Sequence, residues 1–574
     1  MKRLRPFQSL AIFSLVSAAL VMVASNPARA ARGKDKPRVD AVFAEFDKPD
    51  SPGCALGVIQ DGELTYTQGY GMASLEHSAP IDSDTVFRTG SVSKQFAAAA
   101  VAILAEAGKL SLDDDIRKHT PELPAYERPI TIRHLVHHTS GLRDYAGLAF
   151  MAGIDATDHY IEVESLELIA RQRGTDFAPG AEYSYSNTGY FLLGQIVKRV
   201  SGQSLREYAE EHMFGPLGMK RTHFHDDLSE VIAKRASGYS PLEEGGFRVD
   251  MTGWEQIGDG GIFTTLEDLL LWDRNFYENR LGKGNPALIE TLETTGKLND
   301  GEAIDYAFGL VVDEYRGLRR VSHGGAWVGF RAQLTRFPEQ RFSVAVLCNV
   351  GTASPDRYAR QVAELYLAEE FKGKADVEKG KDVRAKADKP VKVPEAELRR
   401  LAGHYWNDRY KLRQKIAVEK GQLVYKGGSG GGTPLRPVGS DRFVLEEDES
   451  TEVRFPGSQK GEARTMIVAS EGEEPIEFEA FEPVSPSPKT LGEYSGSYYC
   501  DELDAQFTIE PDGRELDFAV GHLSDKTLAP LFPDVFQYDD WLTFAFERDE
   551  SGQVDHMSLD TGRVRNLACS RRRG

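Results

Sequence analysis

The chain has 574 residues, with 69 lysines and arginines against 89 aspartates and glutamates, which gives a formal charge of −20. Length alone predicts three or four domains at about 150 residues each. Hydrophobic residues make up 40% of the chain, enough to bury substantial cores, so a disordered or collagen-like chain is excluded. The strong negative charge argues against a nucleic-acid partner, because phosphates would repel it.

The first thirty residues have the pattern of a secretory signal peptide. Basic residues at the start precede an uncharged apolar run over residues 10–24, and Ala28-Arg29-Ala30 fits a small-x-small cleavage site. The run is about 15 residues long, shorter than the roughly 20 that a membrane-spanning helix needs. We therefore expect cleavage near Ala30 and export to the periplasm or the medium, with a retained membrane anchor as the alternative.

Residues 31–371 mix strand-like and helix-like patterns and are predicted to form one domain. Near its start, residues 54–60 and 63–70 flank the turn Asp61-Gly62, as in an antiparallel hairpin. The stretch over roughly residues 91–276 is mostly helical in pattern, with loops between the helices.

A second strand pair is predicted near the end of this domain. Residues 326–337 read as one strand, residues 338–340 as a turn, and residues 342–348 as a second strand. Strands at both ends with helices between them predict an α+β domain whose terminal segments share one sheet.

Residues 372–394 are rich in Lys, Asp, Glu and Ala and predict a solvated linker. Beyond them the sequence repeats itself at an offset of about 93 residues. Matching positions in the two copies are Leu398 with Leu491, Gly403 with Gly496, and Tyr405 with Tyr498. Each copy has short alternating segments broken by turn residues, which predicts two small antiparallel β-barrels over residues 395–484 and 488–574.

The first candidate site is Gly90-Ser91-Val92-Ser93-Lys94, which opens an apolar, Ala-rich segment ending at Gly108. We expect a buried helix, whose N-terminal amides and dipole favour negative charge near Ser91. Lys94 lies about one turn further, so its amine shares a face with the Ser91 hydroxyl, and lost hydration lowers its pKa. Lys94 can then accept the serine proton. A helix-capping serine beside a surface lysine fits the same residues.

The second candidate is Tyr185-Ser186-Asn187, which precedes a helix with an apolar stripe that ends at Gly202. A tyrosine just ahead of a rigid helix can be held in a cleft, where a neighbouring lysine ammonium favours its phenolate form. The Asn187 amide can both donate and accept hydrogen bonds. The structural alternative is that Tyr185 packs in the core and Asn187 caps the helix.

The third candidate is His323-Gly324-Gly325, followed by Ala326, at the end of a predicted strand. Two glycines let a substrate backbone approach the strand edge, and the N–H group just past them can form half of an oxyanion hole. A tight turn beside a buried histidine is the alternative.

The three motifs in this order resemble the active-site set of the serine β-lactamase and penicillin-binding protein superfamily. The chain carries Ser-x-x-Lys, the Tyr-x-Asn variant of the second motif, and His-Gly-Gly in place of Lys-Thr-Gly. The resemblance spans roughly residues 40–370 and is closest to class C β-lactamases, D-aminopeptidases, DD-carboxypeptidases and related esterases. It implies an antiparallel sheet flanked by helices with a helical subdomain. The two following barrels, lipocalin-like in pattern, resemble the three-domain layout of D-aminopeptidases.

The resemblance also implies roles for individual residues. Ser91 would be the acylated nucleophile, Lys94 its proton acceptor, and Tyr185 the relay to the leaving group. The implied substrate-binding residues are Asn187, which holds the substrate amide, and His323, Gly324, Gly325 and Ala326. The N–H groups of Ser91 and Ala326 would form the oxyanion hole. No cofactor is implied.

Histidine at position 323 is a weaker, pH-dependent cation than lysine, which disfavours β-lactams and favours D-amino-acid peptides, amides or small esters. In D-aminopeptidases a loop of the last barrel reaches the active site. Residues 521–526 are the candidate for such a loop here, with Asp525 as a partner for a substrate ammonium. We expect an exported serine hydrolase acting through an acyl-enzyme on a small substrate. A β-lactamase, a DD-carboxypeptidase, or a catalytically weak penicillin-recognising sensor of cell-wall material are the alternatives, and the oligomeric state is left open.

Two groups of histidines invite a metal hypothesis: His134, His137 and His138, and separately His223 and His225. No carboxylate or cysteine completes an obvious ligand set for the first group, and the second has only Asp226 and Asp227 nearby, so no metal is expected.

The four cysteines fall into two pairs. Cys54 and Cys348 lie in strands that the predicted fold brings together, and Cys500 and Cys569 both lie in the last barrel. Disulfides and buried free thiols are equally compatible with this placement.

Overall fold

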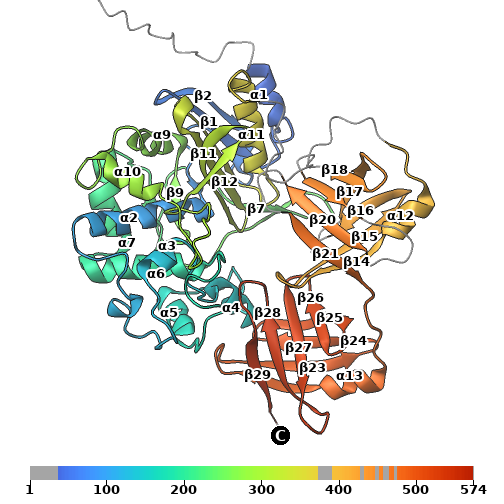
Figure 1. Ribbon diagram of the computed structural model, residues 1–574. Helices are drawn as coiled ribbons and strands as arrows, with labels where there is room; N and C mark the ends of the chain where they lie inside the picture. Colours follow the sequence, from blue (N-terminus) through green and yellow to red (C-terminus); the bar gives the residue numbers. More distant parts are fainter. Residues whose placement is uncertain are drawn as a thin grey trace, which may run out of the picture.

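The computed structural model describes residues 36–242, 244–372, 391–426, 432–446, 451–456, 464–470 and 475–572. The predicted signal peptide and most of the predicted linker lie outside the described residues. Within those ranges, no helix combines the length and apolar character needed to cross a membrane. Figure 1 shows an N-terminal domain of mixed helices and strands followed by two barrels.

A six-stranded antiparallel sheet, in the order β10-β11-β12-β13-β1-β2, lies within the N-terminal domain. Its strands are β1 (Cys54–Gln60), β2 (Glu63–Tyr70), β10 (Val311–Tyr315), β11 (Leu318–Trp327), β12 (Phe330–Phe337) and β13 (Phe342–Cys348). Because β1 pairs with β13, the N-terminal hairpin and the last strands share the sheet, as the sequence predicted.

The prediction of a single strand over residues 326–337 is wrong. Val328 has φ 43°, so the chain turns there and separates β11 from β12. The turn brings Gly329 against the backbone of Tyr239, where an added Cβ would lie 2.3 Å from the amide nitrogen. A long-range contact of this kind leaves no local pattern in the sequence.

Alternate residues of the central strands face opposite sides of the sheet, as the period of a strand requires. Leu56 and Val346 belong to the hydrophobic cluster that holds α1 (Lys36–Val42) and α11 (Pro355–Tyr366) on one face. Ala55 and Leu347 belong to the cluster on the other face, which includes α2 (Lys94–Glu106), α9 (Leu266–Asn275) and the rest of the helical region.

The helical region predicted between the two strand groups is present. Its remaining helices are α3 (Ile132–Val136), α4 (Tyr145–Met151), α5 (Glu162–Ala170), α6 (Asn187–Ser201), α7 (Leu205–Ala209), α8 (Gly215–Leu217) and α10 (Pro286–Leu292). Short strands join them: β3 (Met72–Ser74), β4 (Ala79–Pro80), β5 (Phe87–Arg88), β6 (His223–Phe224), β7 (Tyr239–Pro241), β8 (Phe247–Val249) and β9 (Ile262–Thr264). Helix α2 is buried from Lys94 to Leu104, and Gly202 ends α6 with φ 81°, as predicted.

The internal repeat forms two closed antiparallel barrels of the same topology. The first contains β14 (Gly403–Asn407), β15 (Leu412–Glu419), β16 (Gln422–Lys426), β17 (Thr433–Pro437), β18 (Arg442–Leu445), β19 (Thr451–Arg454), β20 (Thr465–Ser470) and β21 (Ile476–Phe481). The second contains β22 (Gly496–Cys500), β23 (Ala505–Asp512), β24 (Glu515–Val520), β25 (Leu523–Phe532), β26 (Val535–Tyr538), β27 (Leu542–Arg548), β28 (Val554–Asp560) and β29 (Leu567–Arg572).

Equivalent tyrosine side chains form the same hydrogen bond in the two barrels. A short helix precedes each one: α12 (Glu395–Leu401) and α13 (Pro488–Tyr494). The Tyr405 hydroxyl donates to the Leu401 carbonyl at 2.7 Å, and the repeat-related Tyr498 hydroxyl donates to the Tyr494 carbonyl at 2.8 Å. The predicted repeat is therefore structural as well as sequential.

All four cysteines are in disulfides. One joins Cys54 of β1 to Cys348 of β13, and the other joins Cys500 to Cys569 within the second barrel. The first closes a sequence separation of 294 residues and ties the two halves of the sheet together.

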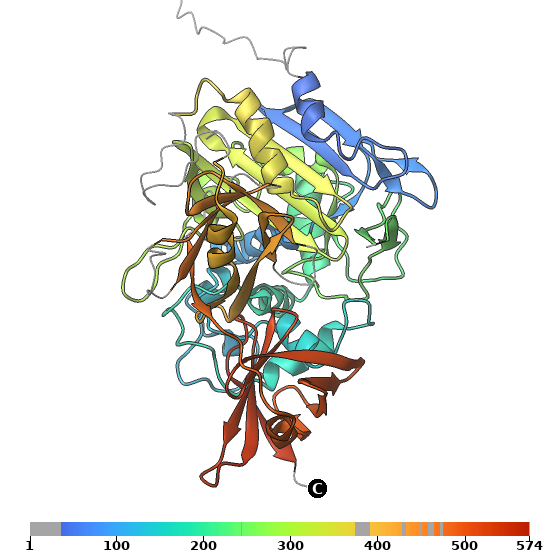
Figure 2. The same cartoon turned by 90° about the vertical axis from the view of Figure 1, so that its right-hand side faces the viewer.

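The second barrel docks on the N-terminal domain beside α4 (Figure 1), and Figure 2 shows the same contact from the side. Arg143 pairs with Glu502 of the barrel at 2.6 Å, and Arg565 of the barrel pairs with Glu182 at 3.1 Å. The Asp144 amide donates to the carbonyl of Arg563 at 3.1 Å. These contacts fix the β22–β23 turn and the β28–β29 loop against the N-terminal domain.

Candidate active site

The three sequence motifs converge on one cleft of about 1280 Å³. The predicted site residues that line it are Ser91, Tyr185, Asn187, His323, Gly324, Gly325 and Ala326. Ser91 lies in the 3₁₀ turn that leads into α2, Asn187 begins α6, and His323 lies in β11. The cleft therefore lies between the helical region, which carries Ser91 and Asn187, and strand β11 of the sheet, which carries His323.

Lys94 lies beneath Ser91, with its Nζ 3.0 Å from the serine Oγ. The side chain is fully buried, and this burial lowers the pKa of Lys94 to about 8. At pH 7 roughly one-tenth of such lysines are neutral, far more than for an exposed lysine. The predicted geometry and the predicted direction of the pKa are both present.

Two further acceptors hold the lysine amine in place. Nζ donates to Oδ1 of Asn187 at 2.8 Å and to the backbone carbonyl of Asp259 at 2.8 Å. Since the Asn187 oxygen is engaged by Lys94, its NH₂ group is the part of the amide that remains for a substrate carbonyl.

Tyr185 is held as a neutral phenol, and the expectation of a phenolate is wrong. Burial raises the pKa of Tyr185, and this effect outweighs the lowering by its hydrogen bond with Ser91 and by the charge of Arg563. The Lys94 Nζ lies 4.8 Å from the centroid of the Tyr185 ring. His138 packs against the other part of the ring at a centroid distance of 4.2 Å.

Glycines bring the nucleophile turn and β11 into backbone contact. A Cβ on Gly325 would lie 1.9 Å from the Thr89 carbonyl oxygen and 3.1 Å from the Ser91 nitrogen. A Cβ on Gly90, whose φ is +52°, would lie 2.7 Å from the Ala326 nitrogen. No side chain fits in this contact, so the backbone of the nucleophile turn approaches that of β11, and both Ser91 and Ala326 line the cleft.

His323 is not a cation in this site. Burial lowers the pKa of His323 to about 4, so the ring is neutral near pH 7. Its Nδ1 donates to the Gly324 carbonyl at 2.6 Å, and its Nε2 accepts from the Tyr306 hydroxyl at 2.9 Å. The expectation of a pH-dependent cation at the third motif is therefore wrong in the physiological range.

Two aspartates that the motifs did not single out support the catalytic residues. Asp144 Oδ2 accepts from the backbone N–H of Asn187 at 2.6 Å, and its Oδ1 accepts from the backbone N–H of Gly147 at 3.0 Å. Asp259 Oδ2 accepts from the Tyr145 hydroxyl at 3.1 Å, and burial raises the pKa of this carboxyl. Asp259 lies in Gly258-Asp259-Gly260-Gly261, a stretch that also resembles the family, whereas no local signal identified Asp144.

A loop of the second barrel does reach the cleft, but it is not residues 521–526. Thr561 and Arg563, in the loop between β28 and β29, line the cleft, and the Arg563 guanidinium lies 5.1 Å over the Tyr185 ring. Gly521 instead contacts Gly153, and the Asp525 side chain lies outside the described residues. The side chain that the barrel presents at the cleft is thus basic, where an acidic one was expected.

The histidines of the first metal hypothesis each form a hydrogen bond with a backbone amide or carbonyl. His134 accepts from the Thr131 amide at 3.1 Å, His138 accepts from the Ser186 amide at 3.1 Å, and His137 contacts the Tyr306 carbonyl at 3.0 Å. They position the turns around the cleft.

A buried helix carrying Ser and Lys one turn apart, with a Tyr-x-Asn segment and a glycine strand facing them, defines a serine hydrolase of the penicillin-recognising type. The chain belongs to the beta-lactamase family, whose model matches residues 39–368. The match covers the whole N-terminal domain and stops before the barrels.

Individual relatives extend the similarity to the barrels. A D-aminopeptidase of Gluconobacter oxydans is 28% identical over 555 residues, covering 93% of this chain and 98% of the relative. A D-aminopeptidase of Brucella anthropi is 31% identical over 298 residues, covering 52% and 56%. Among solved structures, the octameric penicillin-binding protein homologue from Pyrococcus abyssi is 25% identical, with a TM-score of 0.55, and the match covers 78% of this chain and 99% of that one.

Proposed function

We propose that this serine hydrolase cleaves amides and peptides whose acyl part is a D-amino acid, through an acyl-enzyme on Ser91. The observation that carries the proposal is the buried Lys94 amine, 3.0 Å from the Ser91 hydroxyl at the floor of the cleft. Similarity to the D-aminopeptidase of Gluconobacter oxydans over nearly the whole chain, both barrels included, supports the D-amino-acid class.

Acylation begins when neutral Lys94 accepts the Ser91 proton and the serine oxygen attacks the substrate carbonyl. The N–H groups of Ser91 and Ala326 then stabilise the oxyanion, and each such donor contributes about 3 kcal/mol to the transition state. Asn187 donates its NH₂ group to the substrate amide.

The leaving amine needs a proton, and Tyr185 is the donor. Because burial keeps Tyr185 a phenol, its hydroxyl can protonate the amine as the C–N bond breaks, and it recovers a proton from the Lys94 ammonium. Water then attacks the ester, with the same pair accepting its proton, and releases the D-amino acid and Ser91.

Arg563 supports a preference for peptides over simple amides. Its guanidinium is exposed at the cleft beside Tyr185 and forms no ion pair with any carboxylate in the described ranges. A peptide whose leaving residue keeps a free carboxylate can bind this cation, whereas a D-amino-acid amide cannot. The neutral His323 leaves this role to the barrel loop.

A substrate panel tests the proposal. D-alanyl anilide, D-Ala-D-Ala, the L-alanyl counterparts, a short-chain nitrophenyl ester and a cephalosporin are compared for the wild type and for Ser91→Ala, with a fluorophosphonate probe as a label for Ser91. We expect turnover of the D-compounds above the L-compounds. Equal rates for both stereoisomers, or fastest turnover of the cephalosporin, would contradict the D-amino-acid proposal. A labelled but inactive enzyme would favour the penicillin-recognising sensor.

We also propose that the enzyme is exported, as the pattern of its first thirty residues indicates. Two disulfides in the folded chain support an oxidising compartment. Cell fractionation with N-terminal sequencing tests this, and a cytoplasmic protein that keeps residues 1–30 would contradict it.

A further inference from the structure

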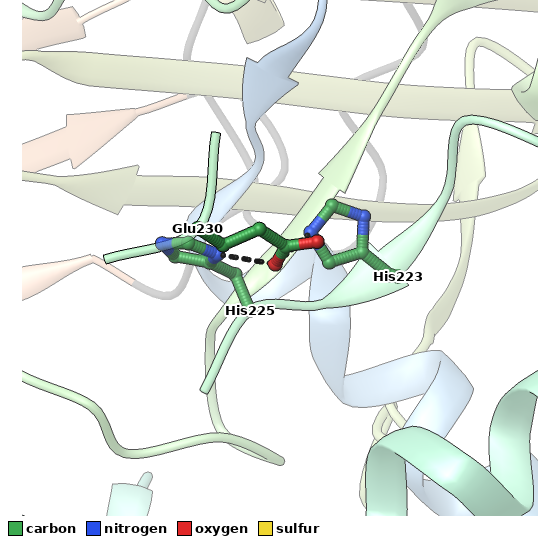
Figure 3. Close-up of side chains that lie close together, drawn as sticks. All are labelled: His223, His225 and Glu230. Carbon is green, nitrogen blue, oxygen red and sulfur yellow. Dashed lines mark hydrogen bonds and ion pairs between the residues drawn. The ribbon is translucent and has the colours of Figure 1, made fainter. Parts of the chain in front are cut away.

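We propose that His223, His225 and Glu230 form a binding site for one divalent transition-metal ion, with Zn²⁺ as the best fit. The two histidines flank Phe224 at the end of β6, so both rings project from the same face of the chain. Figure 3 shows that Glu230, from the turn that follows, places its carboxylate between the two rings. None of the three residues lines the catalytic cleft, so this site is separate from the serine chemistry.

The two distances from the Glu230 carboxylate match those between the ligands of a tetrahedral ion. Oε2 of Glu230 lies 3.3 Å from Nε2 of His223 and 3.3 Å from Nδ1 of His225. One ligand atom from each residue lies within 4.8 Å of the other two. Ligands at about 2.1 Å from Zn²⁺ in a tetrahedron lie about 3.4 Å from one another, a separation that both Glu230 contacts already have.

An orphaned nitrogen also indicates a missing partner. Nε2 of His223 is buried and forms no hydrogen bond within the part of the chain that the structure describes, although the Glu230 oxygen is near. The His225 side chain is only 2% exposed. A metal ion would satisfy the unpartnered nitrogen.

The surroundings orient the carboxylate for this role. Arg206 donates to Oε1 of Glu230 at 2.7 Å and to Asp226 at 3.0 Å, and Oε2 shares a hydrogen bond with Nδ1 of His225 at 3.3 Å, so an ion would take the place of the proton between Oε2 and Nδ1. Outer partners of this kind commonly hold a metal-binding carboxylate in position. With two histidines and one carboxylate as ligands, a water molecule would complete four-coordination.

The site would stabilise the floor of the catalytic cleft from behind. The His225 amide donates to the Gly261 carbonyl at 2.8 Å, two residues after Asp259, whose own carbonyl accepts from Lys94. An ion that binds β6 to Glu230 would therefore hold the loop on which the lysine amine rests. We expect a contribution to stability and no direct part in catalysis.

Zinc binding by the purified, untagged full chain tests the proposal. After dialysis against a chelator, calorimetric titration with Zn²⁺ should show one site per chain and a melting temperature higher by several degrees. Cobalt(II) should give the visible absorption bands of a tetrahedral ion. Glu230→Gln, which keeps the side chain's volume, and the double variant His223→Ala/His225→Ala should each weaken binding at least tenfold.

The matched control is the double variant His522→Ala/His556→Ala, which removes two exposed histidines of the second barrel and should bind like the wild type. Fluorophosphonate labelling of Ser91 reports whether each variant is folded. If the histidine variant unfolds, Glu230→Gln alone is compared with the wild type. The proposal would be overturned if the wild type took up no stoichiometric Zn²⁺. It would also be overturned if Glu230→Gln bound Zn²⁺ as tightly as the wild type.

Discussion

The pH dependence of acylation follows from the burial of Lys94. Only the neutral amine accepts the Ser91 proton, and burial sets the pKa of Lys94 at about 8. The neutral fraction is roughly one-tenth at pH 7 and nine-tenths at pH 9, so kcat/KM should rise about eightfold to tenfold between them. The sign is fixed, because raising the pH removes the proton that blocks the base.

The assay uses a short-chain nitrophenyl ester, which has no ionisable group in this range, with Ser91→Ala as the blank for spontaneous hydrolysis. Arg563→Gln is the matched perturbation. Because the guanidinium disfavours an ammonium on Lys94, its removal should move the midpoint upward, by less than about one pH unit for an exposed charge. Arg399→Gln, on α12, should leave the midpoint unchanged. A flat profile from pH 6 to 9, or activity that falls over this range, would refute the role given to Lys94.

Three more results are expected. Arg563→Gln should lower kcat/KM about fivefold for D-Ala-D-Ala but not for its C-terminal amide, since an exposed ion pair contributes about 1 kcal/mol; equal losses on both substrates would contradict a carboxylate contact. Gly325→Ala should reduce kcat about 100-fold or more, because its Cβ would meet the Thr89 carbonyl and separate β11 from Ser91. The control is Gly492→Ala, in open space on α13, and an active Gly325→Ala would contradict the oxyanion hole. Replacing both Cys54 and Cys348 by serine should cost about 2–5 kcal/mol of unfolding free energy in urea, and an unchanged midpoint would show that the bridge does not stabilise the sheet.

Much of the fold was open to prediction because its signals are local. The hairpin of β1 and β2 follows from strand alternation around Asp61-Gly62, and the end of α6 follows from Gly202. The two barrels were predicted because a repeated sequence repeats its structure. The turn at Val328 was missed, since its cause is the contact of Gly329 with a distant strand.

In the candidate site, too, the features set by local spacing were predicted and those set by long-range packing were not. Ser91 and Lys94 are three residues apart on a helical turn, so local geometry sets their relation, and the structure has them as predicted. The protonation of Tyr185 and His323 was predicted wrongly, because burial by residues far along the chain outweighs the neighbouring charge. Glu230 was passed over because only folding turns its carboxylate toward His225.

By itself, then, the sequence determined the serine–lysine chemistry, the α+β class and the paired barrels, each of which depends on periodicity or on spacing within a few residues. The tertiary structure alone decided which cation lies at the cleft. It buries His323 as a neutral ring and brings Arg563, 240 positions further along the chain, to the same cleft. Desolvation and long-range docking are properties of the packed molecule, and no local pattern encodes them.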